Sequence, residues 1–145
     1  MPTWKKVLLW TTGILVVTVG GCFAITDRLF SDMCATTVFD EISSPSQKLK
    51  AVVFQIDCGA TSDFNTQVAI VKASFNTSEA KFLPKSFFVA HRDNGRAPAG
   101  ISKGPEVRLN WQSDDELRVQ YHQFARVLRS ENRQGGVTIQ YQTFQ

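Results

Sequence analysis

The feature that most constrains this chain is an uncharged apolar run near its N-terminus. Residues 7–25 carry no Asp, Glu, Lys or Arg over 19 positions. A helix of that length spans about 28 Å, close to the roughly 30 Å hydrocarbon core of a bilayer. The run therefore predicts one N-terminal transmembrane helix ahead of a separate folded domain.

The charges beside this run predict its orientation. Lys5 and Lys6 precede it, whereas Asp27 and Arg28 follow it and roughly cancel. Because the more positive flank stays in the cytoplasm, residues 1–6 are expected inside. We then expect the anchor at 7–25, a tether at 26–33 and an extracytoplasmic domain at 34–145, periplasmic or extracellular. The sequence thus predicts a single-pass protein of a bacterial cytoplasmic membrane.

Two alternatives to a spanning helix remain open. Gly20, Gly21 and Ala24 are small enough for the cleavage site of a signal peptide. Val19–Cys22 resembles a lipobox, in which Cys22 would be lipidated and become the first residue. However, the apolar run continues to residue 25, and no polar tether follows Cys22, so the spanning helix is favoured. All three interpretations place the domain outside the cytoplasm.

The cysteines fit that location. With Cys22 in the anchor, Cys34 and Cys58 are the two in the exported part, and an oxidising compartment favours a disulfide between them. The alternative is a metal site that combines these thiols with His91 and His122. Because the four residues lack the local spacing of known zinc sites, the sequence predicts the disulfide and no metal or cofactor.

The charge of the exported part excludes one class of partner. The chain has 16 Lys and Arg against 13 Asp and Glu. Without Lys5 and Lys6 the balance is 14 against 13, so the domain is almost neutral. A near-neutral domain lacks the basic surface that nucleic acid requires, and no nucleic-acid partner is expected.

The exported part is expected to be all-β, as an antiparallel sheet or sandwich of about seven or eight strands. Short runs rich in Val, Ile, Phe and Thr alternate with clusters of Gly, Pro, Ser, Asn and Asp. The predicted strands are 36–42, 48–57, 66–72, 86–90, 106–112, 116–122, 124–129 and 137–143. Strand 48–57 is apolar on both sides in its middle, which indicates a central strand covered on both faces. Gly135 and Gly136 suit a hairpin turn before the last strand.

Strands 106–112 and 116–122 alternate cleanly between apolar and polar residues, and this pattern predicts their register. A three-residue loop at 113–115 keeps apolar residues opposite apolar ones. The expected pairs are Trp111 with Leu117, Leu109 with Val119, Val107 with Tyr121, Asn110 with Arg118, Arg108 with Gln120 and Glu106 with His122. The first three pairs would face a core and the last three would face solvent.

The connection 91–105 is the first candidate binding site. Long irregular loops in compact domains are usually functional or disordered, and this one carries His91, Asp93, Asn94 and Arg96. The structural alternative is an ordered Ω-type loop with a turn at 93–95 and solvated charges. The ordered loop is favoured over a binding role.

Glu106 and His122 are the second candidate site. As cross-strand neighbours they could form an acid–base pair, although such pairs on a wet sheet face are more often incidental. Because no nucleophile motif accompanies them, no catalytic residue is assigned, and enzyme activity is left open with a leaning against it.

Several segments, taken in order, resemble a known family. They are 44–54, Asp57–Thr61, Thr66–Val68, Phe88–Ala90, Gly95–Ala99 and Gly104–Val107. In this order they resemble a family of uncharacterised bacterial proteins with one N-terminal membrane segment and a small extracytoplasmic domain. The resemblance covers most of residues 34–143 and implies the same topology. It implies no activity, cofactor or catalytic residue.

These inferences favour a non-enzymatic envelope module, anchored in the membrane by residues 7–25. Its expected partner is an envelope protein or a cell-wall component, bound through the 91–105 loop and the adjoining sheet face. The alternatives are a periplasmic immunity or inhibitor protein, and a small hydrolase-like enzyme. The hydrolase would use His91 with Asp93, or Glu106 with His122.

Overall fold

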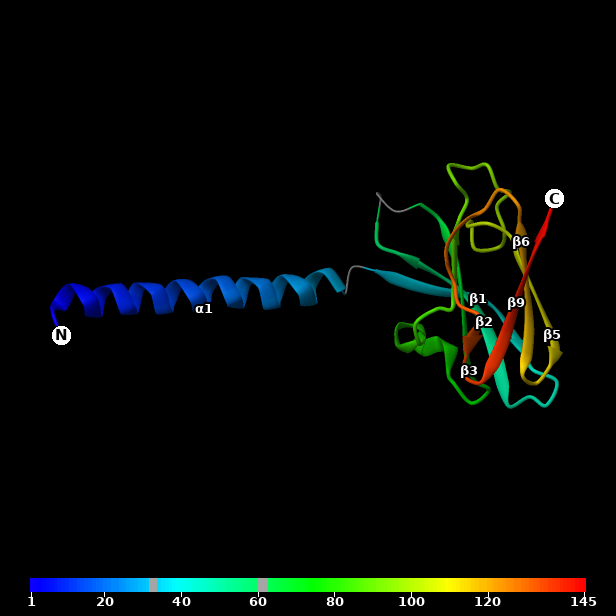
Figure 1. Cartoon of the computed structure of the whole chain (residues 1–145), viewed down its shortest axis with the longest axis horizontal. Coiled ribbons are helices and arrows are strands. Elements are labelled where there is room, and N and C mark those ends of the chain that lie inside the picture. Colours follow the sequence, from blue (N-terminus) through cyan, green and yellow to red (C-terminus); the bar gives the residue numbers. More distant parts are fainter. Residues whose placement is uncertain (32–33, 60–62) are drawn as a thin grey trace. The chain divides into compact units, whose positions relative to one another are not determined.

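The computed structural model describes residues 1–31, 34–59 and 63–145, which form two units, Met1–Cys34 and Ala35–Gln145. The first unit contains helix α1 (Thr3–Ser31), and the second is built of strands (Figure 1). The part of α1 from Thr3 to Cys22 is long and apolar enough to cross a membrane. Because α1 continues to Ser31, residues 26–31 of the predicted tether are helical, and residues 32–33 lie outside the described part.

The strands form two sheets, as the all-β prediction required. The five-stranded sheet contains β1 (Ala35–Ser43), β2 (Leu49–Asp57), β3 (Asn65–Lys72), β4 (Phe88–His91) and β7 (Arg126–Ser130), in the order β1-β2-β3-β4-β7. The four-stranded sheet contains β5 (Val107–Ser113), β6 (Glu116–His122), β8 (Arg133–Gln134) and β9 (Val137–Phe144), in the order β5-β6-β9-β8. The short strand β8 and a 3-10 helix, η1 (Thr77–Phe82), were not predicted.

The core lies between the two sheets. It combines alternate residues of the five-stranded sheet, such as Val53 and Val68, with Leu117, Val119 and Ile139 of the four-stranded sheet. All five side chains are buried. Because side chains alternate along a strand, the residues between them face outward, which explains the alternation of the C-terminal strands.

Strand β2 is central and covered on both faces, as predicted. It pairs with β1 on one side and with β3 on the other. Val53 faces the core between the sheets, whereas Val52 and Phe54 join a second apolar cluster that includes Phe75 and Leu83. The connection between β3 and β4 supplies the last two residues, so this segment covers the outer face of the sheet.

The predicted register of β5 and β6 is confirmed for its five strand pairs, from Val107 opposite Tyr121 to Trp111 opposite Leu117. The turn differs from the prediction, because Ser113 still pairs with Glu116 and the strand is irregular between Trp111 and Ser113. A bulge therefore absorbs the residue that a three-residue loop would have held.

Two further connections shape the second sheet. Gly135 and Gly136 have φ angles of 57° and 84°, and they turn the chain between the paired residues Gln134 and Val137, as expected for this hairpin. Strands β6 and β9 run parallel, unlike the other pairs. The chain leaves β6, passes through β7 in the other sheet, and returns to β9 in the same direction, as a parallel pair requires.

The predicted disulfide is present. Cys34 and Cys58 are disulfide-bonded, and each lies one residue beyond the pair formed by Ala35 and Asp57. The bond therefore closes the open end of the β1–β2 ladder. Together with the apolar helix, it indicates secretion or membrane anchoring.

One end of the β-domain, which we call the loop end, gathers the connections of interest. There β1 begins and β2 ends, and Asn65 of β3 pairs with His91 of β4, which pairs with Arg126 of β7. In the other sheet, His122 and Phe144 are the last pair of β6 and β9. The 91–105 connection and the β6–β7 turn both start from this end.

Candidate functional site

The first half of the 91–105 connection is an ordered turn. Asp93 and Asn94 have φ angles of 52° and 57° and Gly95 has one of 88°, so the chain reverses where the sequence suggested a turn. The Ala97 amide donates to the Arg92 carbonyl at 3.0 Å, and Arg92 Nε donates back to the Ala97 carbonyl at 3.0 Å. Ala97 is fully buried, which anchors the turn to the domain.

The second half of the connection packs against β3. Thr66 Oγ1 donates to the Pro105 carbonyl at 2.8 Å and lies 2.6 Å from Ser102 Oγ. Because the Thr66 proton is used, Ser102 is the donor of the second bond. A Cβ on Gly104 would lie 2.5 Å from the carbonyl carbon of Asn65, so only glycine fits there. The 91–105 connection is therefore an ordered loop packed against the domain, which agrees with the Ω-type loop considered from the sequence.

A small pocket lies beside this loop. It has a volume of about 290 Å³ and is lined by residues of the loop together with Val53, Thr66 and Val107. Its two buried hydroxyls, on Thr66 and Ser102, already bond to each other. Neither proton is directed at the carboxylate that lines the pocket, that of Glu106, because Ser102 donates to Thr66 and Thr66 donates to the Pro105 carbonyl.

A chain of contacts crosses the loop end on the side of the four-stranded sheet. Arg96 Nη1 pairs with Asp93 Oδ2 at 2.9 Å, and its guanidinium lies 5.3 Å from the Phe124 ring. The His122 ring lies 5.4 Å from Phe124 and 5.7 Å from Phe144. Arg108 lies 4.2 Å from the Phe144 ring and pairs with Glu106 at 2.7 Å. We call these residues the rim cluster: Asp93, Arg96, Glu106, Arg108, His122, Phe124 and Phe144.

The rim cluster unites four of the six residues singled out from the sequence, Asp93, Arg96, Glu106 and His122. Of the other two, His91 is a half-buried ladder residue paired with Asn65 and Arg126. Asn94 is exposed in the turn. Sequence reasoning missed Arg108, Phe124 and Phe144. Phe124 was assigned to the start of the predicted strand 124–129, but β7 begins at Arg126, which leaves Phe124 in the turn after β6.

The predicted pairing of Glu106 with His122 is not part of the β5–β6 ladder. β5 begins at Val107, and the Glu106 carboxylate turns to Arg108 on its own strand. The Nδ1 atom of His122 accepts a hydrogen bond from the Phe124 amide at 3.2 Å. Each group thus has a different partner, and the two do not form a proton-transfer pair.

The outer face of the four-stranded sheet extends from the rim cluster. Its exposed and half-buried positions are mostly amides and guanidinium groups. We call this surface the amide face: Arg108, Asn110, Gln112, Arg118, Gln120, Gln140 and Gln142. The pairings arrange these side chains in rows across three strands, such as Asn110, Arg118 and Gln140. In the next row, Gln120 donates to Gln142 at 3.1 Å.

Shifted pKa values occur at groups outside the rim cluster. Hydrogen bonds from Lys50 and then Thr77 lower the pKa of Glu41, and the Ser46 amide lowers the pKa of Asp114. Burial, followed by the nearby Glu131, raises the pKa of Tyr141. Tyr141 Oη donates to the Glu131 carbonyl at 2.6 Å. Each of these three groups hydrogen-bonds to a residue of another strand or turn, so it stabilises the fold.

The described residues contain no group of three or more His, Cys, Asp or Glu side chains that could hold a metal ion. The metal site considered from the sequence also needed the thiols of Cys34 and Cys58, which are disulfide-bonded.

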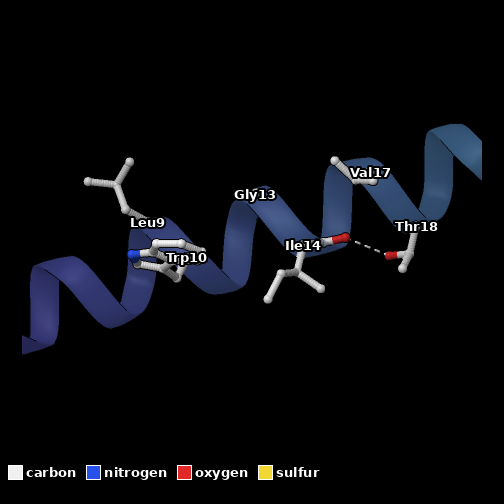
Figure 2. A pocket seen from close by; sticks show the side chains of 6 residues that line it. All are labelled: Leu9, Trp10, Gly13, Ile14, Val17 and Thr18. Carbon is white, nitrogen blue, oxygen red and sulfur yellow. Dashed lines mark hydrogen bonds between the residues drawn. The ribbon is translucent and has the colours of Figure 1, made fainter.

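A separate hollow lies on α1. Figure 2 shows its lining, which includes Leu9, Trp10, Gly13 and Val17. All of these residues belong to one helix, and the hollow exists because Gly13 has no side chain between the larger ones. Thr18 Oγ1 bonds back to the Ile14 carbonyl at 2.8 Å (Figure 2). A single helix encloses no ligand, so the hollow is a packing surface of the apolar segment.

No protein-family model, no curated protein and no solved structure matches this chain. The family resemblance drawn from the sequence accordingly stays a prediction.

Proposed function

We propose that this chain is a membrane-tethered module whose β-domain binds the cell-wall glycan outside a bacterial cytoplasmic membrane. Residues 7–25 would span that membrane with residues 1–6 in the cytoplasm. The apolar helix, the preceding lysines and the disulfide support this location.

The amide face carries the proposal for the ligand. An amide side chain both donates and accepts hydrogen bonds, so it matches sugar hydroxyl and acetamido groups, which do the same. Rows such as Asn110, Arg118 and Gln140 place two such amides on either side of a guanidinium, which only donates. The Phe144 ring at the end of the face lies beneath the Arg108 guanidinium, 4.2 Å from it, and so holds that donor at the edge of the face.

The composition of the face favours a glycan over a protein partner. Stable protein interfaces have an apolar core and hot spots rich in Trp, Tyr and Arg, whereas the amide face combines two arginines with five amide side chains and no apolar centre. The inhibitor alternative is therefore less well supported. The hydrolase alternative is weakened by the separate partners of Glu106 and His122.

The test is co-sedimentation of the full chain, in mild detergent, with purified cell-wall sacculi. Arg118→Ala/Gln140→Ala removes two paired side chains of the amide face. We expect it to weaken binding about 30-fold, the equivalent of two hydrogen bonds of about 1 kcal/mol each. The control, Lys72→Ala/Gln47→Gly, removes one exposed cation and one exposed amide elsewhere and should bind like wild type.

Two results would overturn the proposal. One is a wild-type chain that stays in the supernatant at every sacculus concentration. The other is equal binding by the amide-face variant and the control. If wild type and both double variants instead capture the same soluble envelope protein to the same extent, the chain binds a protein partner through a surface other than the amide face.

The state of the anchor has its own test. The intact mass of the protein extracted from membranes should equal that of the full chain, because we propose that residues 7–25 are retained. A mass that starts at Cys22 with added acyl chains would instead identify a lipoprotein. A mass that starts after Ala24 would identify a cleaved signal peptide.

A further inference from the structure

The exposed apolar side chains of the β-domain are concentrated at the loop end. Among its described residues, five large apolar side chains are exposed: Phe64, Phe82, Ile101, Phe124 and Leu128. Phe64 directly precedes the first residue of β3, Ile101 lies in the loop packed on Thr66, and Phe124 lies between β6 and β7. These three are 43%, 71% and 45% exposed.

Cations lie beside these side chains. The Lys103 ammonium lies 5.7 Å from the Phe64 ring, and Arg96 lies 5.3 Å from the Phe124 ring. Ile101 precedes Lys103 by two residues in the same turn. Lys103 forms no ion pair with the described residues. An apolar body with an adjoining cation is the chemistry of side chains that lie at a membrane interface.

The length of chain between the proposed span and β1 limits how far this end can lie from the membrane. The predicted span ends at residue 25, and α1 continues to Ser31, which adds about 9 Å of helix. Residues 32–34 add at most about 11 Å even when fully extended. Ala35, which begins β1 at the loop end, is therefore within about 20 Å of the hydrocarbon boundary, and lipid headgroups fill about the first 6 Å of that distance.

This inference rests on the membrane span proposed above for residues 7–25: we propose that the loop end docks onto the headgroup surface of that membrane. Phe64, Ile101 and Phe124 enter the interface, and Lys103 contacts lipid phosphates, whereas Arg96 stays paired with Asp93. The amide face lies mainly along the strands, outside this contact, so the docking is independent of glycan binding. Docking would hold the amide face in a constant orientation toward the cell wall.

The test uses the full chain in vesicles that contain brominated lipids, which quench tryptophan fluorescence on contact. Trp4→Phe and Trp10→Phe remove the anchor signals and leave Trp111 as a constant background. Phe64→Trp and Ile101→Trp then report on the loop end. The matched control is Phe82→Trp, because Phe82 is 62% exposed and has Lys81 at 5.0 Å. It lies on η1, in the connection that leaves the opposite end of β3.

We expect loss of fluorescence and a blue shift for the two loop-end reporters and neither for the Phe82→Trp control. In anionic vesicles, Lys103→Gln should reduce the ratio of lipid-contacting to non-contacting protein about fivefold. One cation near an anionic surface contributes about 1 kcal/mol, which corresponds to that factor. Lys81→Gln should leave it unchanged. Equal quenching of Ile101→Trp and Phe82→Trp would overturn the docking, and an unaltered Lys103→Gln variant would overturn the phosphate contact. Sacculus binding by the same variants is expected to persist, which separates this outcome from that of the glycan proposal.

Discussion

The indole Nε1 of Trp111 donates a hydrogen bond of 2.9 Å to the carbonyl oxygen of Ile42. The two residues belong to β5 and β1, which are edge strands of different sheets. Trp111 also packs against the core between the sheets. This single side chain thus joins the two layers at their edges, where no backbone ladder connects them.

Trp111→Phe should lower the free energy of unfolding by about 1 kcal/mol, the usual net value of one intramolecular hydrogen bond. The ring of phenylalanine keeps most of the packing, but it cannot donate to Ile42. Denaturant unfolding monitored by circular dichroism measures the loss. Trp10→Phe, on the exposed surface of α1, is the control and should leave the transition of the β-domain in place.

Gly104→Ala should destabilise the domain by about 3 kcal/mol, because overpacking forces the backbone of a packed segment to shift. The new Cβ would lie 2.5 Å from both Asn65 C and Thr66 Oγ1. Thermal unfolding gives the size of the effect. Lys103→Gly is the matched control, since Lys103 is exposed and has a φ of 61°, which glycine adopts without strain. A Gly104→Ala variant as stable as that control would contradict the close packing of this loop on β3.

Replacement of both Cys34 and Cys58 by serine should cost about 3 kcal/mol of stability, because the bond closes a loop of 23 intervening residues. Peptide mapping without reduction should recover the two cysteines in one cross-linked peptide. Two separately alkylated thiols in protein isolated from the cell would contradict the assignment. The Cys22→Ser variant is the control and should unfold like wild type.

The ion pair between Lys50 Nζ and Glu41 Oε2, at 2.6 Å, predicts a pH dependence of stability. Lys50 and then Thr77 lower the pKa of Glu41 in the folded chain. The stabilisation is therefore complete above the ordinary pKa of 4.5. It is lost as the pH falls through the lowered value, because the unfolded chain then binds the proton more readily.

Glu41→Gln should remove this part of the acid transition and lower stability near neutral pH by about 1 kcal/mol, a modest value because the Glu41 side chain is partly exposed. Unfolding curves recorded between pH 3 and 7 test both effects. Glu79→Gln changes another exposed carboxylate and serves as the control. If the stability of Glu41→Gln kept the same acid dependence as wild type, the ion pair would not be its source.

Most of the local structure could be predicted from the sequence. The alternation of Val107, Leu109 and Trp111 gave the register with β6, because a slip of one residue would turn every apolar side chain toward solvent. The two-sided apolar pattern around Val53 gave the central place of β2. The paired glycines at 135–136 predicted the last hairpin, because glycine adopts the positive φ angles of a two-residue hairpin turn without a steric penalty.

The sequence identified some residues of the candidate site but not the contacts they make. His122 and Glu106 were recognised as candidates, but their partners, Phe124 and Arg108, were not. A cross-strand neighbour follows from register alone. Both partners lie only two residues away along the chain, and the alternation of a strand does not specify which rotamer a side chain adopts where the strand begins or ends.

The sequence by itself determined an apolar N-terminal segment, a β-domain with a disulfide between its two cysteines, and the inward face of each C-terminal strand. These properties depend on hydrophobicity and on the two-residue period of a strand, both of which are local. Tertiary structure alone decided the pairing of β4 with β7, the parallel pairing of β6 with β9, and the contacts that join Asp93 to Glu106 through three aromatic rings. Their physical cause is the burial of two apolar sheet faces against each other, which selects among strand orders that the local pattern leaves equivalent.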